Sequence, residues 1–347
     1  MSSGYRSDRG QNILGLCLFV LLLAGIGIVS AHAPLGVGSN EDIANATHFD
    51  TPEKSYVLYT ELHEGGEAQY YHFPMQKGQN LYGSIQIPGP SSMVPDIVII
   101  GPGIEAAGNV PSFVEVPAGS GAMVIPGKTP GKPSYEPFSP QPIYETGRFN
   151  VTVPIEGDYY IAVYGPTGGK YSLAPGFLEQ FTATEWLLIP FSVIAIHLWE
   201  GQSPWEVFAP LIVVVIGGLA LLEMYRKKSG LQHDPIRWMI LLSGLLYLGG
   251  AAMTSLQIVH AVRVTGYGNE VLVTIMFIAG PVILGIFAIM EGMQQTRPDS
   301  LSKSGIKMII IGILGLLFWA GLIIGPVLAI ISGVLILVKR SVKPNPV

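Results

Sequence analysis

The sequence predicts an exported all-β domain followed by an α-helical transmembrane bundle. Three observations support this fold class: a basic and then apolar leader, a first half of short alternating strands, and a second half of long apolar segments. Of the 347 residues, 49% are hydrophobic and 12% are charged. This balance is typical of a membrane protein with a sizeable soluble part.

The leader has the parts of a signal peptide. Arg6 and Arg9 precede an uncharged stretch at 13–30, and a Val-Ser-Ala sequence that ends at residue 31 fits a cleavage site. Cleavage there makes His32 the first residue of the mature chain. The stretch is also nearly long enough to cross a bilayer, so an uncleaved anchor is the alternative.

The exported domain is expected to be stable without disulfide bonds. Cys17 is the only cysteine and lies within the leader. After cleavage the chain therefore has no thiol, and residues 32–184 depend on their own apolar core. A domain of about 150 residues is large enough to bury such a core.

Short alternating strands fill the region from residue 32 to 184. Tyr and Val enrichment, two-residue alternation and frequent Gly and Pro turns predict an all-β sandwich. The predicted strands are 55–61, 68–73, 80–87, 97–100, 121–125, 147–153, 159–164 and 170–174. The stretch 101–142 is dense in Pro, Gly and Ser, which predicts long loops that join short strands.

Two passages of this region resemble a known family. Residues 69–81 (QYYHFPMQKGQNL) place an aromatic strand before a Lys-Gly-Gln turn, and 155–165 (IEGDYYIAVYG) precede GKYSL at 169–173. With the Asp-led strand at 96–99, these motifs resemble the bacterial pre-peptidase C-terminal domain over residues 66–175. The resemblance implies a secreted β-sandwich that serves as a binding or folding module. A long Pro-rich insertion after Gly103 departs from the family pattern.

The two halves differ in charge. Residues 32–184 contain 15 Asp and Glu against 6 Lys and Arg, whereas residues 185–347 contain 8 acidic and 11 basic residues. An acidic exported domain argues against nucleic acid and against anionic lipid headgroups as partners. It is compatible with cations, neutral glycans or protein partners.

The second half predicts five membrane spans and one shorter helix. The apolar segments are 186–198, 205–224, 236–259, 271–290 and 306–338. The first is too short to span a bilayer, and a tryptophan lies at each end, so it is predicted to be interfacial or re-entrant. The last is long enough for a tight hairpin, with Gly325 and Pro326 at the reversal.

Basic residues in the short loops predict the orientation. With the exported domain outside and the last segment crossing twice, 10 of the 11 basic residues of the second half face the cytoplasm. The predicted organisation is then a signal peptide, the exported domain, a short helix at 185–204, a bundle at 205–343 and a cytoplasmic tail at 344–347. No family resemblance marks the membrane half.

Four histidines of the exported domain suggest a copper site. A mature N-terminal histidine offers its amine and its imidazole to one ion, and a second imidazole completes a histidine brace. The candidate ligands are His32, His48, His63 and His72. The alternative is that they are unrelated surface residues, and the brace fails if the leader is not cut at residue 31.

Polar residues also gather at the predicted outer membrane surface. They are His197 and Glu200 at the end of the short helix, and Gln257, His260 and Arg263 at the outer end of the third segment. One interpretation is a polar pocket beneath the exported domain, in which Arg263 pairs with Glu200. The other is a set of interfacial side chains that reach toward water.

Two Asn-x-Thr sequences, at Asn45 and Asn150, are glycosylation acceptors if the domain is exported. No phosphate loop, dinucleotide fingerprint, zinc motif or nucleophile elbow occurs in the sequence. The sequence therefore favours a cell-surface membrane protein with a non-enzymatic binding, adhesion or accessory role. The alternatives are a copper-dependent redox protein, and a transport or sensing unit with an extracellular ligand domain.

Overall fold

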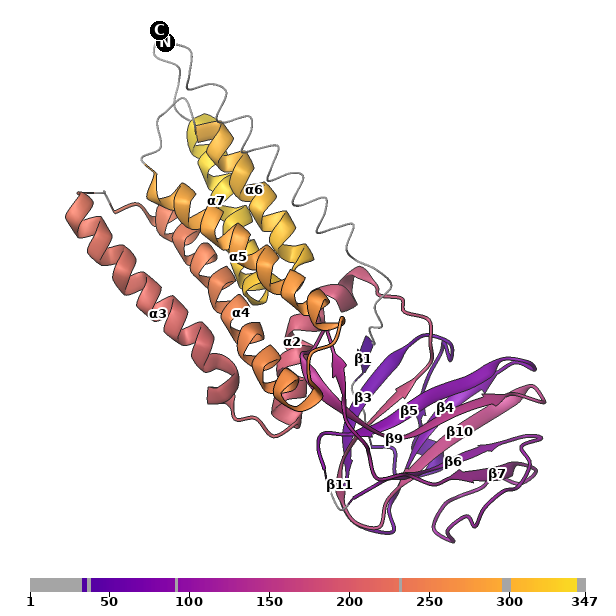
Figure 1. The fold of residues 1–347 in the computed structure, drawn as a ribbon. Coiled ribbons are helices and arrows are strands. Elements are labelled where there is room, and N and C mark those ends of the chain that lie inside the picture. Colours follow the sequence, from indigo (N-terminus) through magenta and orange to yellow (C-terminus); the bar gives the residue numbers. More distant parts are fainter. Residues whose placement is uncertain (1–32, 36–38, 91–92, 231–232, 295–300, 342–347) are drawn as a thin grey trace.

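The computed structural model describes residues 33–35, 39–90, 93–230, 233–294 and 301–341. The predicted leader, His32 and the predicted cytoplasmic tail lie outside the described residues. The described chain has a β domain at one end of a set of long helices (Figure 1).

The β domain consists of two sheets. Their strands are β1 (Ala33–Leu35), β2 (Thr47–His48), β3 (Tyr56–Leu62), β4 (Ala68–Met75), β5 (Asn80–Ile87), β6 (Asp96–Gly101), β7 (Gly121–Ile125), β8 (Ser134–Glu136), β9 (Gln141–Thr152), β10 (Gly157–Tyr164) and β11 (Gly169–Pro175). The six-stranded sheet has the order β1-β3-β11-β5-β9-β8, and the five-stranded sheet has the order β2-β4-β10-β6-β7. All eight predicted strands are present.

One apolar core joins the two sheets. Tyr171 and Leu58 from the six-stranded sheet, and Tyr71, Phe73 and Tyr159 from the five-stranded sheet, belong to one buried cluster. The alternation of inward and outward side chains along each strand produces this cluster. The core holds one polar chain: the Tyr171 hydroxyl lies 2.6 Å from the Tyr71 hydroxyl and donates to the Gln69 side-chain oxygen at 2.6 Å.

The stretch 101–142 contains more regular structure than predicted. Besides β7, it includes β8 and the first residues of β9, which pair antiparallel with each other. Residues of the β6–β7 connection also pack on the outer face of the five-stranded sheet, where Val114 belongs to a second buried cluster with Tyr70 and Val98. The Tyr70 hydroxyl accepts the Glu115 backbone N–H at 2.8 Å.

The helical part contains six α-helices within the described residues. They are α2 (Ala183–Trp199), α3 (Pro204–Ser229), α4 (Pro235–Thr265), α5 (Val271–Met293), α6 (Leu301–Leu317) and α7 (Ile324–Ser341), with a 3-10 turn, η3 (Ala320–Ile323), between the last two. Capping boxes begin α2 at Thr182 and α3 at Ser203, because each hydroxyl accepts the N–H of a Glu three residues later.

Four helical segments of the described chain are long and apolar enough to cross a membrane: α3, α4, α5 and Ala320–Lys339. The sequence predicts five spans. The difference is α6, whose 17 residues give a length of about 25 Å at ~1.5 Å per residue. This is shorter than the ~30 Å hydrocarbon core of a bilayer.

The last apolar segment reverses earlier than predicted. Gly325 and Pro326 lie in the first turn of α7, and the turn itself occupies 318–323. There Trp319, Leu322 and Ile323 adopt positive φ angles of 51°, 55° and 67°. A proline is well tolerated in the first turn of a helix, so this pair begins a helix and does not break one.

Glycines allow the spanning helices to approach closely. A Cβ atom on Gly244 of α4 would lie 2.8 Å from the Gly285 carbonyl oxygen of α5, and one on Gly312 of α6 would lie 2.8 Å from the Pro326 carbonyl oxygen of α7. Close backbone approach of this kind drives helix association in membranes. By contrast, only 6% of the most apolar window of α3 is buried, and Figure 1 shows α3 at one side of the bundle.

We expect Tyr171→Phe to lower the free energy of unfolding of the β domain by about 1–3 kcal/mol, because it leaves the buried Gln69 oxygen without its closest donor. Thermal unfolding in detergent, followed by near-ultraviolet circular dichroism, measures this loss. Tyr56→Phe, at a half-buried ring at the edge of the same core, is the matched control. Equal effects of the two variants would contradict the assignment of the polar chain.

Candidate functional site

A groove of about 600 Å³ lies between the β domain and the adjoining end of the bundle. Strands β5, β8 and β9, the connection from β11 to α2, and the start of α5 contribute its lining. We call it the junction groove. Its aromatic walls are Tyr82, Tyr135 and Phe177, and the Tyr82 and Phe177 rings meet edge to face with 6.4 Å between centroids. A volume of this size is typical of small-molecule sites.

The junction groove is acidic. Four carboxylates line it, Glu136, Glu145, Glu179 and Glu270, against one guanidinium, Arg148. Arg148 donates to Glu145 at 2.6 Å, so this pair is neutral as a unit. The other three carboxylates lack a cationic partner in the groove lining, and the groove as a whole favours positive charge.

Glu136 is the most perturbed of these carboxylates. Burial raises its pKa from 4.5 to about 7, and repulsion from Glu179 adds to the rise. The Phe138 backbone N–H donates to Glu136 at 3.2 Å and opposes the shift. Near neutral pH this carboxyl group therefore exchanges its proton readily, and a nearby cation favours the ionised form.

Hydrogen bonds hold the two sides of the groove together. The Thr274 hydroxyl of α5 donates to the Pro137 carbonyl oxygen at 2.5 Å and lies 2.8 Å from the Tyr135 hydroxyl of β8. These contacts fix β8 on the first turn of α5. Because the groove walls come from both parts of the chain, any shift of the β domain relative to α5 changes its shape.

A second set of contacts ties the β domain to α2. The Trp199 indole N–H donates to the Thr60 carbonyl oxygen at 3.0 Å, and Lys170 donates to the Trp199 carbonyl oxygen at 2.6 Å. At the other end of the helix, Lys54 and Glu185 form an ion pair of 2.6 Å. The helix is thus held to the six-stranded sheet at both ends.

The predicted outer polar cluster is assembled in part. His197 Nδ1 lies 2.9 Å from Glu200 Oε2, and both side chains are nearly excluded from solvent. Gln202 and Gln257 exchange reciprocal amide hydrogen bonds of 2.9 and 2.8 Å. Gln202 also lies 3.4 Å from His197 Nδ1, so it links the two pairs.

His260 and Arg263 do not join this cluster. Both side chains are exposed, and within the described residues no ion pair connects Arg263 to Glu200. The reason is that Glu200 follows the last turn of α2 and pairs with His197 of that turn. Gln202, which sequence reasoning missed, lies in the short α2–α3 connection, where no periodic pattern marks it.

A small cavity of about 80 Å³ lies beside this cluster, between the helices and the β8–β9 connection. His197, Trp319 and the hydroxyl residues Thr254 and Thr274 contribute polar side-chain atoms to its lining. His197 Nε2 is buried and has no hydrogen-bond partner among the described residues. A buried polar atom beside a cavity that accommodates water is a natural position for a bound water molecule.

The four predicted copper ligands do not form one site. His32 lies outside the described residues. His48 and His72 are neighbours, with 2.8 Å between their Nδ1 atoms, whereas His63 lies in the β3–β4 turn.

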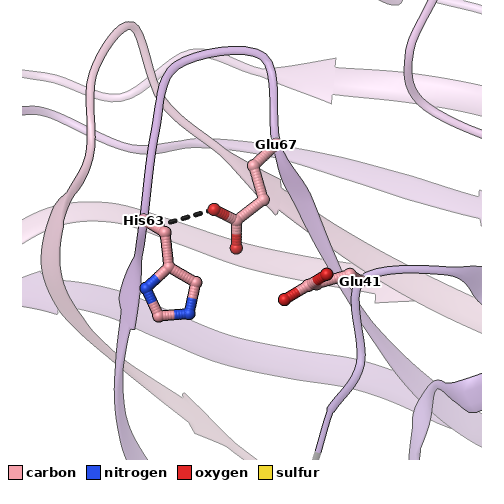
Figure 2. A group of neighbouring side chains, drawn as sticks. All are labelled: Glu41, His63 and Glu67. Atoms are coloured by element: carbon pink, nitrogen blue, oxygen red, sulfur yellow. Dashed lines mark hydrogen bonds between the residues drawn. The ribbon is translucent and has the colours of Figure 1, made fainter.

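The turn histidine belongs to a separate group. Ligand atoms of Glu41, His63 and Glu67 lie within 4.8 Å of one another. Figure 2 shows the three side chains close together. Both Glu67 oxygens already accept hydrogen bonds: one from the backbone N–H groups of His63 and Glu64, and the other from the Gln69 amide. Glu67 therefore stabilises the turn and has little capacity left for a metal ion.

The predicted glycosylation acceptors are both exposed. Asn45 lies in the 3-10 turn η1 (Ile43–Asn45), where its side-chain amide donates to the Asp42 carboxylate at 2.9 and 3.0 Å. Asn150 lies on β9, opposite Tyr82 of β5. A glycan on Asn45 requires the amide to leave this carboxylate.

Sequence reasoning did not anticipate the junction groove. Glu136, Arg148 and Phe177 are far apart in the sequence and carry no shared motif. Their proximity follows from the pairing of β5, β8 and β9 and from the docking of that sheet on α5. The acidic excess of residues 32–184 is the one signal that pointed toward a cationic ligand.

We expect Gln257→Leu to destabilise the junction by about 1–3 kcal/mol, because Gln202 then keeps a half-buried amide without its reciprocal partner. The double variant Gln202→Leu/Gln257→Leu should lose less than the sum of the single variants, since no unpaired amide remains. Unfolding in detergent measures all three. Additive losses would contradict a direct amide pair.

Glu136→Gln should stabilise the protein by about 1–3 kcal/mol at pH 8 and have little effect near pH 4.5. The raised pKa means that the folded state holds its proton more tightly than the unfolded state. Stability is therefore lost as the pH rises from about 4.5 to about 7, and glutamine removes that loss. Melting temperatures at the two pH values test this, with the exposed Glu156→Gln as control. An equal change at both pH values would contradict the prediction.

No protein-family model and no curated protein matches the sequence. Among solved structures, the chain is similar to the crystal structure of PliG from Aeromonas hydrophila, described as a periplasmic lysozyme inhibitor of g-type lysozyme. The two are 18% identical, the match covers 43% of this chain and 98% of that chain, and the TM-score is 0.21. A similarity at this level assigns neither fold nor function.

Proposed function

We propose that the protein is a multi-pass membrane protein that presents its β domain outside the cytoplasm as a non-enzymatic binding module. The junction groove carries this proposal, because it is large enough for a small ligand and has aromatic walls and several carboxylates. The adhesion and accessory roles that the sequence also allows share the same placement of the domain.

The orientation rests on charge. Arg226, Lys227 and Lys228 belong to the last turn of α3, whose end lies far from the β domain in Figure 1. Cytoplasmic loops carry the excess of Lys and Arg in membrane proteins. The acidic β domain at the opposite end is then extracytoplasmic, and a cleavable leader before it fits the same topology.

The fold assignment is a β-sandwich. The two sheets and their shared core support it. The resemblance of residues 66–175 to the bacterial pre-peptidase C-terminal domain is part of the same proposal. The motifs of that resemblance fall on β4, β6, β10 and β11, which are the strands at the centre of the domain.

The chemistry of the junction groove favours an organic cation. Carboxylates attract positive charge, and the faces of Tyr82 and Phe177 add cation–π attraction for an ammonium group. A bare metal ion would use only a small part of a 600 Å³ groove with aromatic walls.

We expect spermidine and choline to bind the full-length protein in detergent, and citrate not to bind, as measured by isothermal titration calorimetry. Substituting Glu136, Glu179 and Glu270 together by Gln should weaken cation binding at least about tenfold, or about 1.4 kcal/mol. Glu156→Gln, an exposed carboxylate in the β9–β10 turn, should leave it unchanged. Cation binding that is indifferent to the triple substitution would reject the groove as the site.

A membrane-impermeant maleimide tests the topology on intact cells. In a Cys17→Ser background, Asn150→Cys on β9 should react and Lys228→Cys at the end of α3 should react only after the cells are opened. Both side-chain positions are exposed, so access to the reagent depends on the side of the membrane. The reverse pattern would overturn the proposed orientation.

One observation favours a sensing unit as a second candidate function. The junction groove includes Asn269, Glu270 and Val273 at the start of α5 as well as strands of the β domain. A ligand that bridges both parts binds best in one relative position of the two, and so shifts their equilibrium. A ligand-dependent change in protease or label access along α5 would favour sensing over simple binding.

A further inference from the structure

Two imidazoles lie side by side on the outer face of the five-stranded sheet. His48 of β2 is the parallel register partner of His72 on β4, and His72 is in turn the antiparallel partner of Tyr160 on β10. Along β4, Tyr71 and Phe73 point into the core, so His72 points the opposite way. The sheet register therefore brings the two imidazoles together.

Each imidazole also contacts a carboxylate through its other ring nitrogen. His72 Nε2 lies 2.8 Å from Asp158 Oδ1, and His48 Nε2 lies 3.1 Å from Asp50 Oδ1. A carboxylate only accepts hydrogen bonds, so the His72 Nε2 that bonds to Asp158 carries a proton. In a neutral His72 with its proton on Nε2, Nδ1 presents a lone pair.

The two Nδ1 atoms face each other. They are 2.8 Å apart, which is the distance of an N–H···N hydrogen bond when either Nδ1 carries a proton. A metal ion that displaces this proton can bind both nitrogens. A metal-ligating histidine nearly always donates its other ring N–H to a carboxylate or carbonyl group, and His72 has that partner in Asp158.

The geometry points to a bis-imidazole site for Cu²⁺, with His48 Nδ1 and His72 Nδ1 as ligands and Asp158 as the positioning residue of His72. Metal–nitrogen bonds of about 2.0 Å at a right angle place the two nitrogens about 2.8 Å apart, whereas a tetrahedral angle places them about 3.3 Å apart. The observed separation thus suits neighbouring positions of a square-planar ion. Among the divalent first-row ions, Cu²⁺ has the highest affinity for nitrogen ligands.

One ligand is anchored and the other can adjust. The His72 ring stacks on Tyr160 at 4.8 Å between centroids, and its side chain is 21% exposed. His48 is 47% exposed on a two-residue edge strand. Tilting His48 moves its lone pair off the line between the nitrogens, to where an ion can bind both. Water then fills the remaining coordination positions.

The other histidine group of the domain is a weaker candidate and a useful control. Glu41, His63 and Glu67 gather one imidazole and two carboxylates, but the Glu67 oxygens are occupied by the turn. His63→Ala therefore removes an exposed imidazole of the same domain and leaves the proposed pair intact. His32→Ala separately removes the imidazole that a cleaved N-terminus would offer to copper.

The test uses the full-length protein in detergent, purified without a polyhistidine tag and carrying His32→Ala, with CuCl₂ as the probe. We expect one Cu²⁺ per chain, and pulsed electron paramagnetic resonance should detect two coupled imidazoles. His48→Ala and His72→Ala should each weaken binding at least about tenfold and leave one coupled imidazole. Asp158→Asn should weaken it by about 10–100-fold while both imidazoles remain coupled. His63→Ala should change neither quantity.

Three outcomes overturn the site. They are no stoichiometric Cu²⁺ in the His32→Ala protein, binding that survives the loss of both His48 and His72, and binding that is lost with His63→Ala. The first of these, with copper bound in the protein that keeps His32, assigns copper to the N-terminus. If His72→Ala fails to fold by circular dichroism, His48→Ala decides the question, because its side chain lies half-exposed on the sheet edge.

Discussion

The structure depends on the docking of the β domain onto the adjoining ends of the helices. Backbone carbonyl groups at this junction are buried or partly buried and need donors, and each part of the chain supplies donors to the other. The Trp199 indole donates to the Thr60 carbonyl oxygen of the sheet, and Lys170 of the sheet donates to the Trp199 carbonyl oxygen at the end of α2. The Thr274 hydroxyl of α5 donates to the Pro137 carbonyl oxygen beside β8. Leaving such groups unpaired costs more than a paired contact contributes. These contacts hold the domain on the helices, and the junction groove exists because of this docking.

The strands of the β domain were largely predictable, because alternation and turn residues act locally. The exceptions are instructive. Strand β8 and the first residues of β9 lie in a Pro-rich stretch that resembles a loop, and they become strands by pairing with each other, whereas β5 pairs with β9 from Tyr144 onward. Such pairing is a long-range property. Within the membrane half, apolar length identified the segments. At the reversal (318–323), Trp319 stacks on Phe277 with 4.5 Å between ring centroids, a long-range contact that no local pattern encodes.

The candidate sites also divide into those that follow from local sequence spacing and those that depend on long-range contacts. His197 and Glu200 are one turn apart on a helix, so their contact follows from sequence spacing. His48 and His72 meet only because β2 joins the edge of the sheet in parallel register with β4, and a shift by one residue would turn His48 to the other face. Glu136 and Glu270 reach one groove through docking of the two parts. Residue types and spacing can therefore predict a contact within one helix, but they cannot predict a contact that depends on strand pairing or on docking of the two parts.

Because α3 is the most exposed of the long apolar helices, its tilt is expected to respond to the thickness of a surrounding bilayer. This helix has 26 residues, or about 39 Å at ~1.5 Å per residue, and it packs chiefly on α4. Its apolar segment, 205–224, is about 30 Å long and matches the hydrocarbon layer, and lipid sets the tilt of such a segment where protein contacts are few. Bilayer thickness therefore acts on α3 more directly than on the enclosed α4. Because α3 begins a few residues after Trp199, a change in the tilt of α3 would displace the end of α2 that contacts the β domain.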